Sequence, residues 1–272
     1  MAWPLTPSIM IKTYIFDANL RKMRAMRSSN PAMTGKIFEK AGTASAGSSV
    51  MTINGTINKI GLMLLMVIAA GAYTWNMVMG ADPGRAGTLA IVGAIGGFIM
   101  ALVTIFRPKS AAITAPIYAI LEGLFLGAIS AILNARYPGI AFQAVLLTIG
   151  TLFTMLFLYR SGYIRATPRF RRGVMMATGA VFFAYMISWL MSLLGMPIGF
   201  MHSAGPLGIL INLVIIVIAA LNLIMDFDFI EKGSQMGAPK YMEWYGAFGL
   251  IVTLIWLYIE FLRLLSRFAG RN

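Results

Sequence analysis

The chain has 272 residues, of which 59% are hydrophobic and 11% charged, with a formal net charge of +13. Soluble domains carry about 25% charged residues, so this deficit of charge excludes an ordinary soluble domain and indicates a polytopic membrane protein. The chain has no cysteine and one histidine, His202, which excludes disulfides, thiol chemistry and zinc sites built on paired histidines. Basic residues between apolar segments serve membrane topology and contact with anionic lipid, so nucleic acid is not an expected partner.

Residues 1–58 form a basic N-terminal tail, rich in Lys, Arg, Ser, Gly and Ala. The tail has no apolar run of signal-peptide length, so cleavage is not expected. We expect it to be largely disordered and cytoplasmic; a role at the membrane surface is the alternative to a solvated tail. The transmembrane domain is then expected to occupy residues 59–272.

Seven apolar segments follow the tail, each near the roughly 20 residues needed to cross a hydrocarbon core of about 30 Å. They lie at 60–80, 86–106, 113–134, 140–159, 173–195, 206–227 and 244–265. The second is the weakest, because Gly93, Gly96 and Gly97 dilute it. No water is present in lipid to hydrogen-bond open backbone groups, so these segments must be helices. The sequence therefore predicts an all-α membrane protein, a seven-transmembrane-helix bundle.

The distribution of Lys and Arg predicts the orientation of the bundle. Seventeen of these residues lie on the tail's side of the membrane and five on the other. By the positive-inside rule, the N-terminus is cytoplasmic and the C-terminus lies outside. The three arginines of the C-terminal end, Arg263, Arg267 and Arg271, argue weakly for the alternative, an even number of crossings or a re-entrant last segment.

Two carboxylates, Glu122 and Glu260, fall well inside predicted spans. A charged side chain at such a depth costs about 2.5–3.5 kcal/mol, and such residues usually face the bundle interior and have a function there. The alternatives are a structural ion pair or a carboxyl kept neutral by burial. Gly123 and Gly127 beside Glu122 form a face for close helix packing. Glu260 precedes Arg263 by three residues, so an internal ion pair is the alternative for Glu260.

The sixth span ends in three acidic residues, Asp226, Asp228 and Glu231, within six positions. Asn222 and Asp226 are four residues apart and share one helix face. Carboxylates at a helix C-terminus are disfavoured by the helix dipole, so we expect a compensating cation; a solvated helix end is the alternative. The candidates for that cation are Lys232, Lys240, Arg107 and a metal ion. Glu243, at the start of the seventh span, is the fourth acid around this loop.

No enzyme signature accompanies these acids. The sequence has no Gly-rich phosphate loop after a strand, no H-E-x-x-H and no G-x-S-x-G. An intramembrane aspartyl mechanism would need two carboxylates that meet, and Asp226 with Glu260 is the one plausible pair, without the flanking glycines typical of such enzymes. We therefore expect no catalytic residues, no enzymatic activity and no resident cofactor.

Three motifs, combined with the seven spans, resemble the Bax inhibitor-1/YccA family over roughly residues 57–266. They are EGLFLGAIS in the third span, MDFDFIEKG at the end of the sixth and LYIEFLRLL in the last. The tail sequence SSNPAMTGKIFEKAG is similar to a bacterial branch of that family. The resemblance implies a bundle whose last helix is central, wrapped by helices one to three and four to six, in a bacterial inner membrane.

The resemblance also implies a function, since family members are described as pH-sensitive calcium leak channels. Their sensor is a pair of aspartates that share protons, and the motifs place this pair on Asp226 and Glu260, with a family arginine on Arg107. Here the second acid is Glu, and 34 residues separate the two. On a simple topology Glu260 lies about 24 Å beyond the level of Asp226, in which case Asp226 is expected to meet Glu243 instead.

Two function hypotheses follow. In the first, coupled titration of two carboxyls gates a cation path, and the ionised oxygens offer hard ligands to calcium, which is expected near Asp226 as the permeant ion. Polar residues supporting that path would be Glu122, Asn222, Asp228, Glu243 and Arg107. In the second, the chain is a non-transporting interaction protein that regulates a protease or another membrane complex through its basic tail. A secondary transporter is a third reading, but no inverted repeat is evident.

Overall fold

The structure, a computed structural model, describes residues 49–80, 82–196 and 205–270. The elements are α3 (Ile53–Met79), α4 (Pro83–Phe106), the short 3-10 helix η1 (Pro108–Ser110), α5 (Ala111–Arg136), α6 (Ile140–Arg160), α7 (Pro168–Leu193), α9 (Pro206–Gln235) and α10 (Met242–Ala269). Seven of these helices are long and apolar enough to cross a membrane. The predicted all-α, seven-helix membrane bundle is therefore confirmed.

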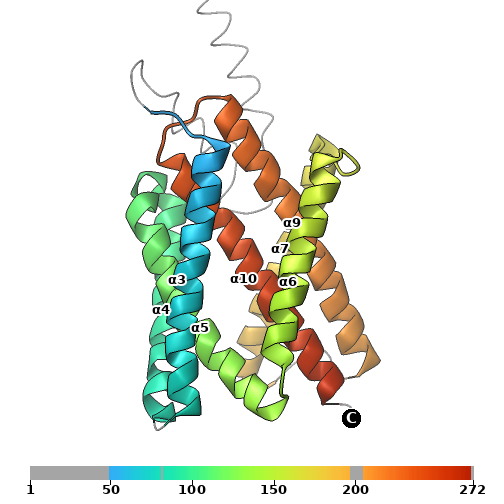
Figure 1. Cartoon of the computed structure of the whole chain (residues 1–272). Helices are drawn as coiled ribbons and strands as arrows, with labels where there is room; N and C mark the ends of the chain where they lie inside the picture. The colour runs from blue at the N-terminus through green and yellow to red at the C-terminus, as the bar shows by residue number, and fades with distance from the viewer. Residues whose placement is uncertain (1–48, 81, 197–204, 271–272) are drawn as a thin grey trace, which may run out of the picture.

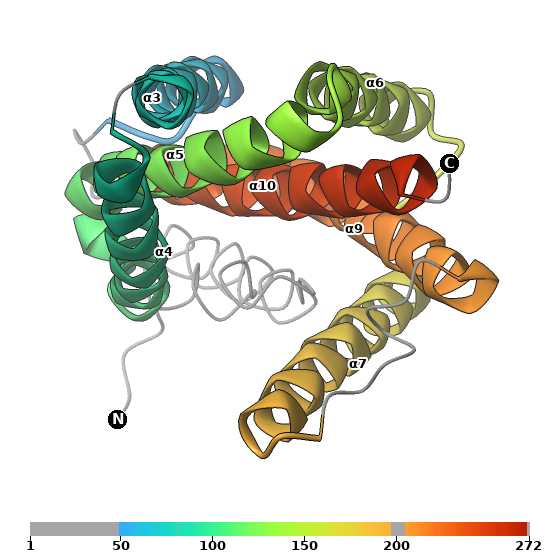
Figure 2. The same ribbon diagram turned by 90° about the horizontal axis from the view of Figure 1, so that it is seen from below.

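The last helix, α10, runs through the centre of the bundle (Figures 1 and 2). It packs against α3, α5, α6 and α9, whereas α4 packs mainly on α5 and α3, and α7 mainly on α9. This arrangement confirms the central last helix that the family resemblance implies. The start of α3 and the end of α10 lie at opposite ends of the bundle (Figure 1), as an odd number of crossings requires.

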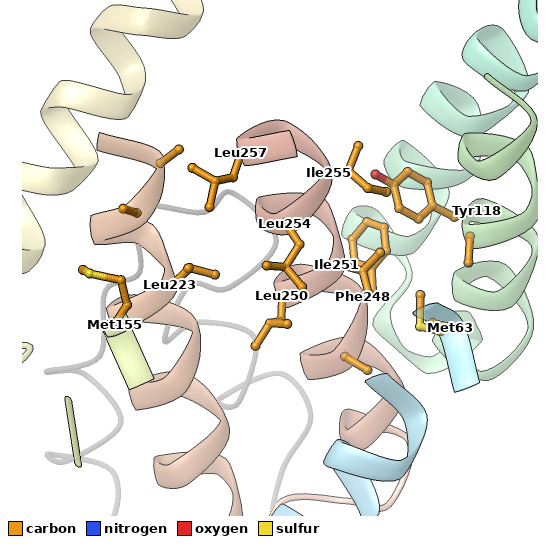
Figure 3. Close-up of a cluster of buried hydrophobic side chains, with 14 of the residues drawn as sticks. Met63, Tyr118, Met155, Leu223, Phe248, Leu250, Ile251, Leu254, Ile255 and Leu257 are labelled. Carbon is orange, nitrogen blue, oxygen red and sulfur yellow. The ribbon is translucent and has the colours of Figure 1, made fainter. Parts of the chain in front are cut away.

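The core consists of apolar side chains on two faces of α10 (Figure 3). Phe248 points toward α5 and α3, where its ring meets Tyr118 edge-on at a centroid distance of 5.0 Å, close to Met63. Leu254 points the other way, toward Leu223 of α9. Edge-to-face rings add to the energy of area burial, so α10 ties the two halves of the bundle together.

Glycines bring α3 and α5 into backbone contact. A Cβ added to Gly127 would lie 2.1 Å from the carbonyl oxygen of Gly71, and one added to Gly123 would lie 2.5 Å from that of Val67. Real side chains do not tolerate such distances, so only glycine permits this approach. The packing role that the sequence predicts for Gly123 and Gly127 is confirmed.

Three helices extend five or more residues beyond the apolar windows predicted for them. α3 starts at Ile53 and α7 at Pro168, earlier than predicted, and α9 continues to Gln235 instead of ending at residue 227. Residues 53–58, assigned to the tail from composition, are thus helical. The rest of the tail up to residue 48, together with His202 and Arg271, lies outside the described residues.

The chain just before α3 is fixed to the turn between α9 and α10. Val50 forms an isolated antiparallel bridge with Pro239, and the Met51 N–H donates to the Ala238 carbonyl at 2.7 Å. The Thr52 side chain then caps α3 by accepting from the Gly55 N–H, as threonine commonly does at a helix start. The junction between the tail and the bundle is therefore part of the fold.

Candidate functional site

Asp226 is fully buried in α9, with 0% of its surface exposed. Because α9 runs on to Gln235, this carboxylate lies more than two turns inside the helix. The expectation that Asp226 lies at the end of its helix is therefore wrong. Asn222, one turn earlier, is also buried, and its amide donates to the Thr178 hydroxyl of α7 at 2.8 Å.

Asp228 is held by two cations. The Arg171 guanidinium of α7 lies 2.5 Å from its carboxylate, and the Lys232 ammonium of α9 lies 2.6 Å from it. Lys232 thus confirms one of the predicted compensating cations. Arg107 is exposed at the end of α4, where its backbone N–H donates to Val103, and its predicted place beside the acids of α9 is wrong. No group of three metal-ligating residues occurs among the described residues.

Glu231 completes this acidic stretch of α9. Its carboxylate accepts hydrogen bonds from the Tyr159 hydroxyl of α6 and, at 3.2 Å, from the Gln235 amide. Asp228 and Glu231 also border an open cleft of about 600 Å³ beside the turn from α6 to α7. The carboxylates that follow Asp226 therefore connect α9 to its neighbours at one end of the bundle.

Glu243 is fully buried at the start of α10 and binds the start of α3. The backbone N–H and hydroxyl of Thr52 each donate to one carboxylate oxygen at 2.9 Å, Lys240 pairs with the same oxygen at 2.8 Å, and Lys59 pairs with the other. A Cβ on Gly55 would lie 2.2 Å from this carboxylate, so glycine makes room for it. Both carboxylate oxygens of Glu243 are thus engaged by Thr52, Lys240 and Lys59.

Glu260 is 1% exposed and lies in a polar cluster near the other end of α10. Arg263 and the Tyr185 hydroxyl of α7 donate to one carboxylate oxygen, at 2.7 and 2.8 Å, and the Asn212 amide of α9 donates to the other at 2.8 Å. The ion pair with Arg263, given above as the alternative for Glu260, is therefore present.

The two acids of the implied sensor lie at different depths. Asn212 contacts Glu260, and Asp226 follows Asn212 by 14 residues on the same helix. At 1.5 Å per residue this places Asp226 about 21 Å further along α9. The structure therefore does not bring Asp226 and Glu260 together.

Glu122 belongs to another part of the bundle. It is half-buried on α5 and faces α4, where a Cβ on Gly97 would lie 2.8 Å from its carboxylate. Gly97 thus leaves room for this acid, as Gly55 does for Glu243. The site residues predicted from the sequence are accordingly spread over several helices and depths.

The structure adds partners that the sequence reading did not identify. Arg171 counts as a loop charge by composition, yet it begins a series on α7 with Thr178 and Tyr185, each seven residues from the last and each contacting a predicted acid or amide. Polar side chains repeating every seven residues mark one helix face. That spacing was the available signal for α7. No comparable signal marks Asn212 or Lys59.

A sequence model described as Bax inhibitor 1 like matches residues 28–270. The match spans most of the chain, which therefore belongs to this family, and it extends into the tail beyond the predicted range of 57–266. No curated protein and no solved structure matches the chain.

Proposed function

We propose that this member of the Bax inhibitor 1 like family is a pH-regulated cation channel that passes calcium, without any enzymatic step. The observation that supports it is Asp226, a carboxylate with 0% exposure inside a membrane-spanning helix. Burying a charge at such a depth costs about 2.5–3.5 kcal/mol, and residues kept there usually serve ions or protons. The membrane is proposed to be the bacterial inner membrane, with the N-terminus in the cytoplasm and the C-terminus outside.

The other buried acids of α9 and α10 suggest how such a path is closed. Asp228 is paired with Arg171 of α7, Glu243 with Lys59 of α3, and Glu260 with Arg263. Calcium takes oxygen ligands, and it would compete with these protein cations for the same carboxylates. The ion pairs are therefore assigned to the closed state.

The pH dependence is assigned to Asp226 without Glu260, because Asp226 lies about 21 Å along α9 from Asn212, the residue that contacts Glu260. Calcium entry into proteoliposomes of the full chain, measured at several pH values, tests this. We expect Asp226→Asn to flatten the curve of flux against pH while leaving the fold intact. Glu260→Gln, which changes a structural cluster, is expected to keep the pH dependence.

Asp82→Asn is the matched control. Asp82 caps α4 at the turn from α3 by accepting from the Arg85 N–H, and asparagine caps helices as well. An Asp226→Asn curve identical to that of the natural protein would reject the assignment. Folded protein with no flux above protein-free liposomes would reject the channel itself.

That last outcome would favour the second candidate, a non-transporting interaction protein. The docking of Val50 and Met51 on the α9–α10 turn supports this candidate, because it connects the basic tail directly to the bundle. Co-purification of a membrane partner that is lost when residues 1–48 are deleted would establish it.

A further inference from the structure

The turn from α6 to α7 forms one wall of an open cleft of about 600 Å³ at the end of the bundle where α3 begins. That wall consists mostly of residues between 159 and 167, including Arg160 and Arg165. Asp228 and Glu231 of α9 also line the cleft. The cleft is therefore lined by charges of both signs.

The geometry of the turn holds Arg165 in place. Gly162 has a φ of +75°, and the Ile164 N–H donates to the Leu158 carbonyl at 3.1 Å. A Cβ on Gly162 would lie 3.6 Å from two guanidinium nitrogens of Arg165, so this side chain folds back over the glycine. A left-handed conformation of this kind suits glycine and few other residues.

The charges in the cleft do not cancel. Asp228 is neutralised by Arg171 and Lys232. Among the ion pairs of the described residues, none involves Arg160 or Arg165, and both side chains are exposed. Arg160 and Arg165 thus give the cleft a net positive charge, and Glu231 adds acceptor oxygens to its lining.

The depth of the cleft fits a lipid headgroup. Arg160 is the last residue of membrane-spanning α6, and α7 begins again at Pro168. The turn therefore lies at the level of the lipid phosphates. In this turn Tyr163 is 81% exposed, and tyrosine is one of the residues enriched at membrane interfaces.

We propose that this cleft binds the headgroup of an anionic phospholipid that carries hydroxyl groups, as phosphatidylglycerol does. The guanidinium groups of Arg160 and Arg165 match a phosphate in charge and in donor geometry. The headgroup hydroxyls donate to Glu231. The proposal does not require that the chain passes calcium, and it assigns a ligand to the turn between α6 and α7 and the end of α9 beside it.

Native mass spectrometry of the full-length protein, delipidated and then supplied with phosphatidylglycerol, tests the site. We expect R160Q/R165Q to lower the retained phosphatidylglycerol about tenfold, since each basic residue near the headgroup contributes to binding. The matched control is R169Q/R172Q, which removes the same charge from exposed positions of α7 that do not line the cleft. The control is expected to change retention less than about twofold.

Three results would overturn the proposal. Equal losses in the two double variants would mean general attraction of basic residues to anionic lipid. Equal retention of phosphatidylcholine would remove the selectivity for an anionic headgroup with hydroxyls. Displacement by millimolar inorganic phosphate would assign the cleft to a soluble phosphate compound instead of a lipid. Thermal unfolding of each variant confirms that retention is compared between folded proteins.

Discussion

The contact between α3 and α5 and the contact of α7 with its neighbours are built by opposite means. α3 and α5 approach through glycines, with Gly127 against the backbone of Gly71. α7 has only three buried residues, Arg171, Val174 and Ser188. It is held instead by polar contacts at three depths, which are Arg171–Asp228, Thr178–Asn222 and Tyr185–Glu260.

The difference follows from the solvent. Lipid is as apolar as leucine, so helices in a membrane associate by close van der Waals packing or by polar contacts. Close backbone packing depends on side-chain size and is indifferent to charge. Polar contacts depend on ionisation and can be exchanged for water or ions. We therefore expect α3–α5 to be the rigid part of the bundle and the position of α7 to depend on charge.

The largest predicted effect on stability concerns the contact between α3 and α5. Gly127→Ala should lower the free energy of unfolding in detergent by about 3 kcal/mol, because the new Cβ has no room beside α3. Gly150→Ala on α6 is the control, since nothing lies within 4 Å of its Cβ position. That variant should be neutral or more stable by up to about 1 kcal/mol. Similar losses in both would mean that close packing does not hold α3 to α5.

The next largest effect concerns the polar contact between α7 and α9. Arg171→Gln should lower the free energy of unfolding by about 2 kcal/mol, less than the roughly 3–5 kcal/mol for an isolated buried charge, because Lys232 still pairs with Asp228. Arg172→Gln, the exposed neighbour, should change it by less than about 0.5 kcal/mol. Adding Asp228→Asn to Arg171→Gln should recover part of the loss. A double variant less stable than Arg171→Gln alone would contradict the electrostatic account.

The smallest effect is at the far end of α7. Tyr185→Phe removes the hydroxyl that bonds Glu260 and Arg263, and should cost about 1 kcal/mol. Tyr163→Phe, at an exposed position, should cost nothing measurable. If Tyr185→Phe were also neutral, the polar contacts of α7 would not act along its whole length.

The sequence predicts all seven spans because length and hydropathy report residence in the hydrocarbon core. It misplaces the ends of helices because hydropathy does not report backbone hydrogen bonding. α9 continues from its apolar residues through Asp226 and Asp228 without a break in the helix. Arg171, the ion-pair partner of Asp228, lies on α7. An acid with a partner elsewhere in the fold looks, in the sequence alone, like the end of the helix.

The sequence predicts contacts within one helix but not contacts between helices, and this explains which parts of the site were predicted. The pairs Asp228–Lys232 and Glu260–Arg263 are local, four and three residues apart, so helix geometry reveals them. The contacts of Tyr185 with Glu260 and of Lys59 with Glu243 join distant helices. Such contacts depend on the register between helices, which a single sequence does not give.

The pairing of Lys59 with Glu243 also has a consequence for biosynthesis. The two residues are 184 positions apart, so at about 5–20 residues per second α3 is made roughly 10–40 s before its partner on α10. The last helix is also the central one. During translation the described membrane-spanning helices from α3 to α9 can enter the bilayer, but they can assemble around α10 only after α10 itself has been made.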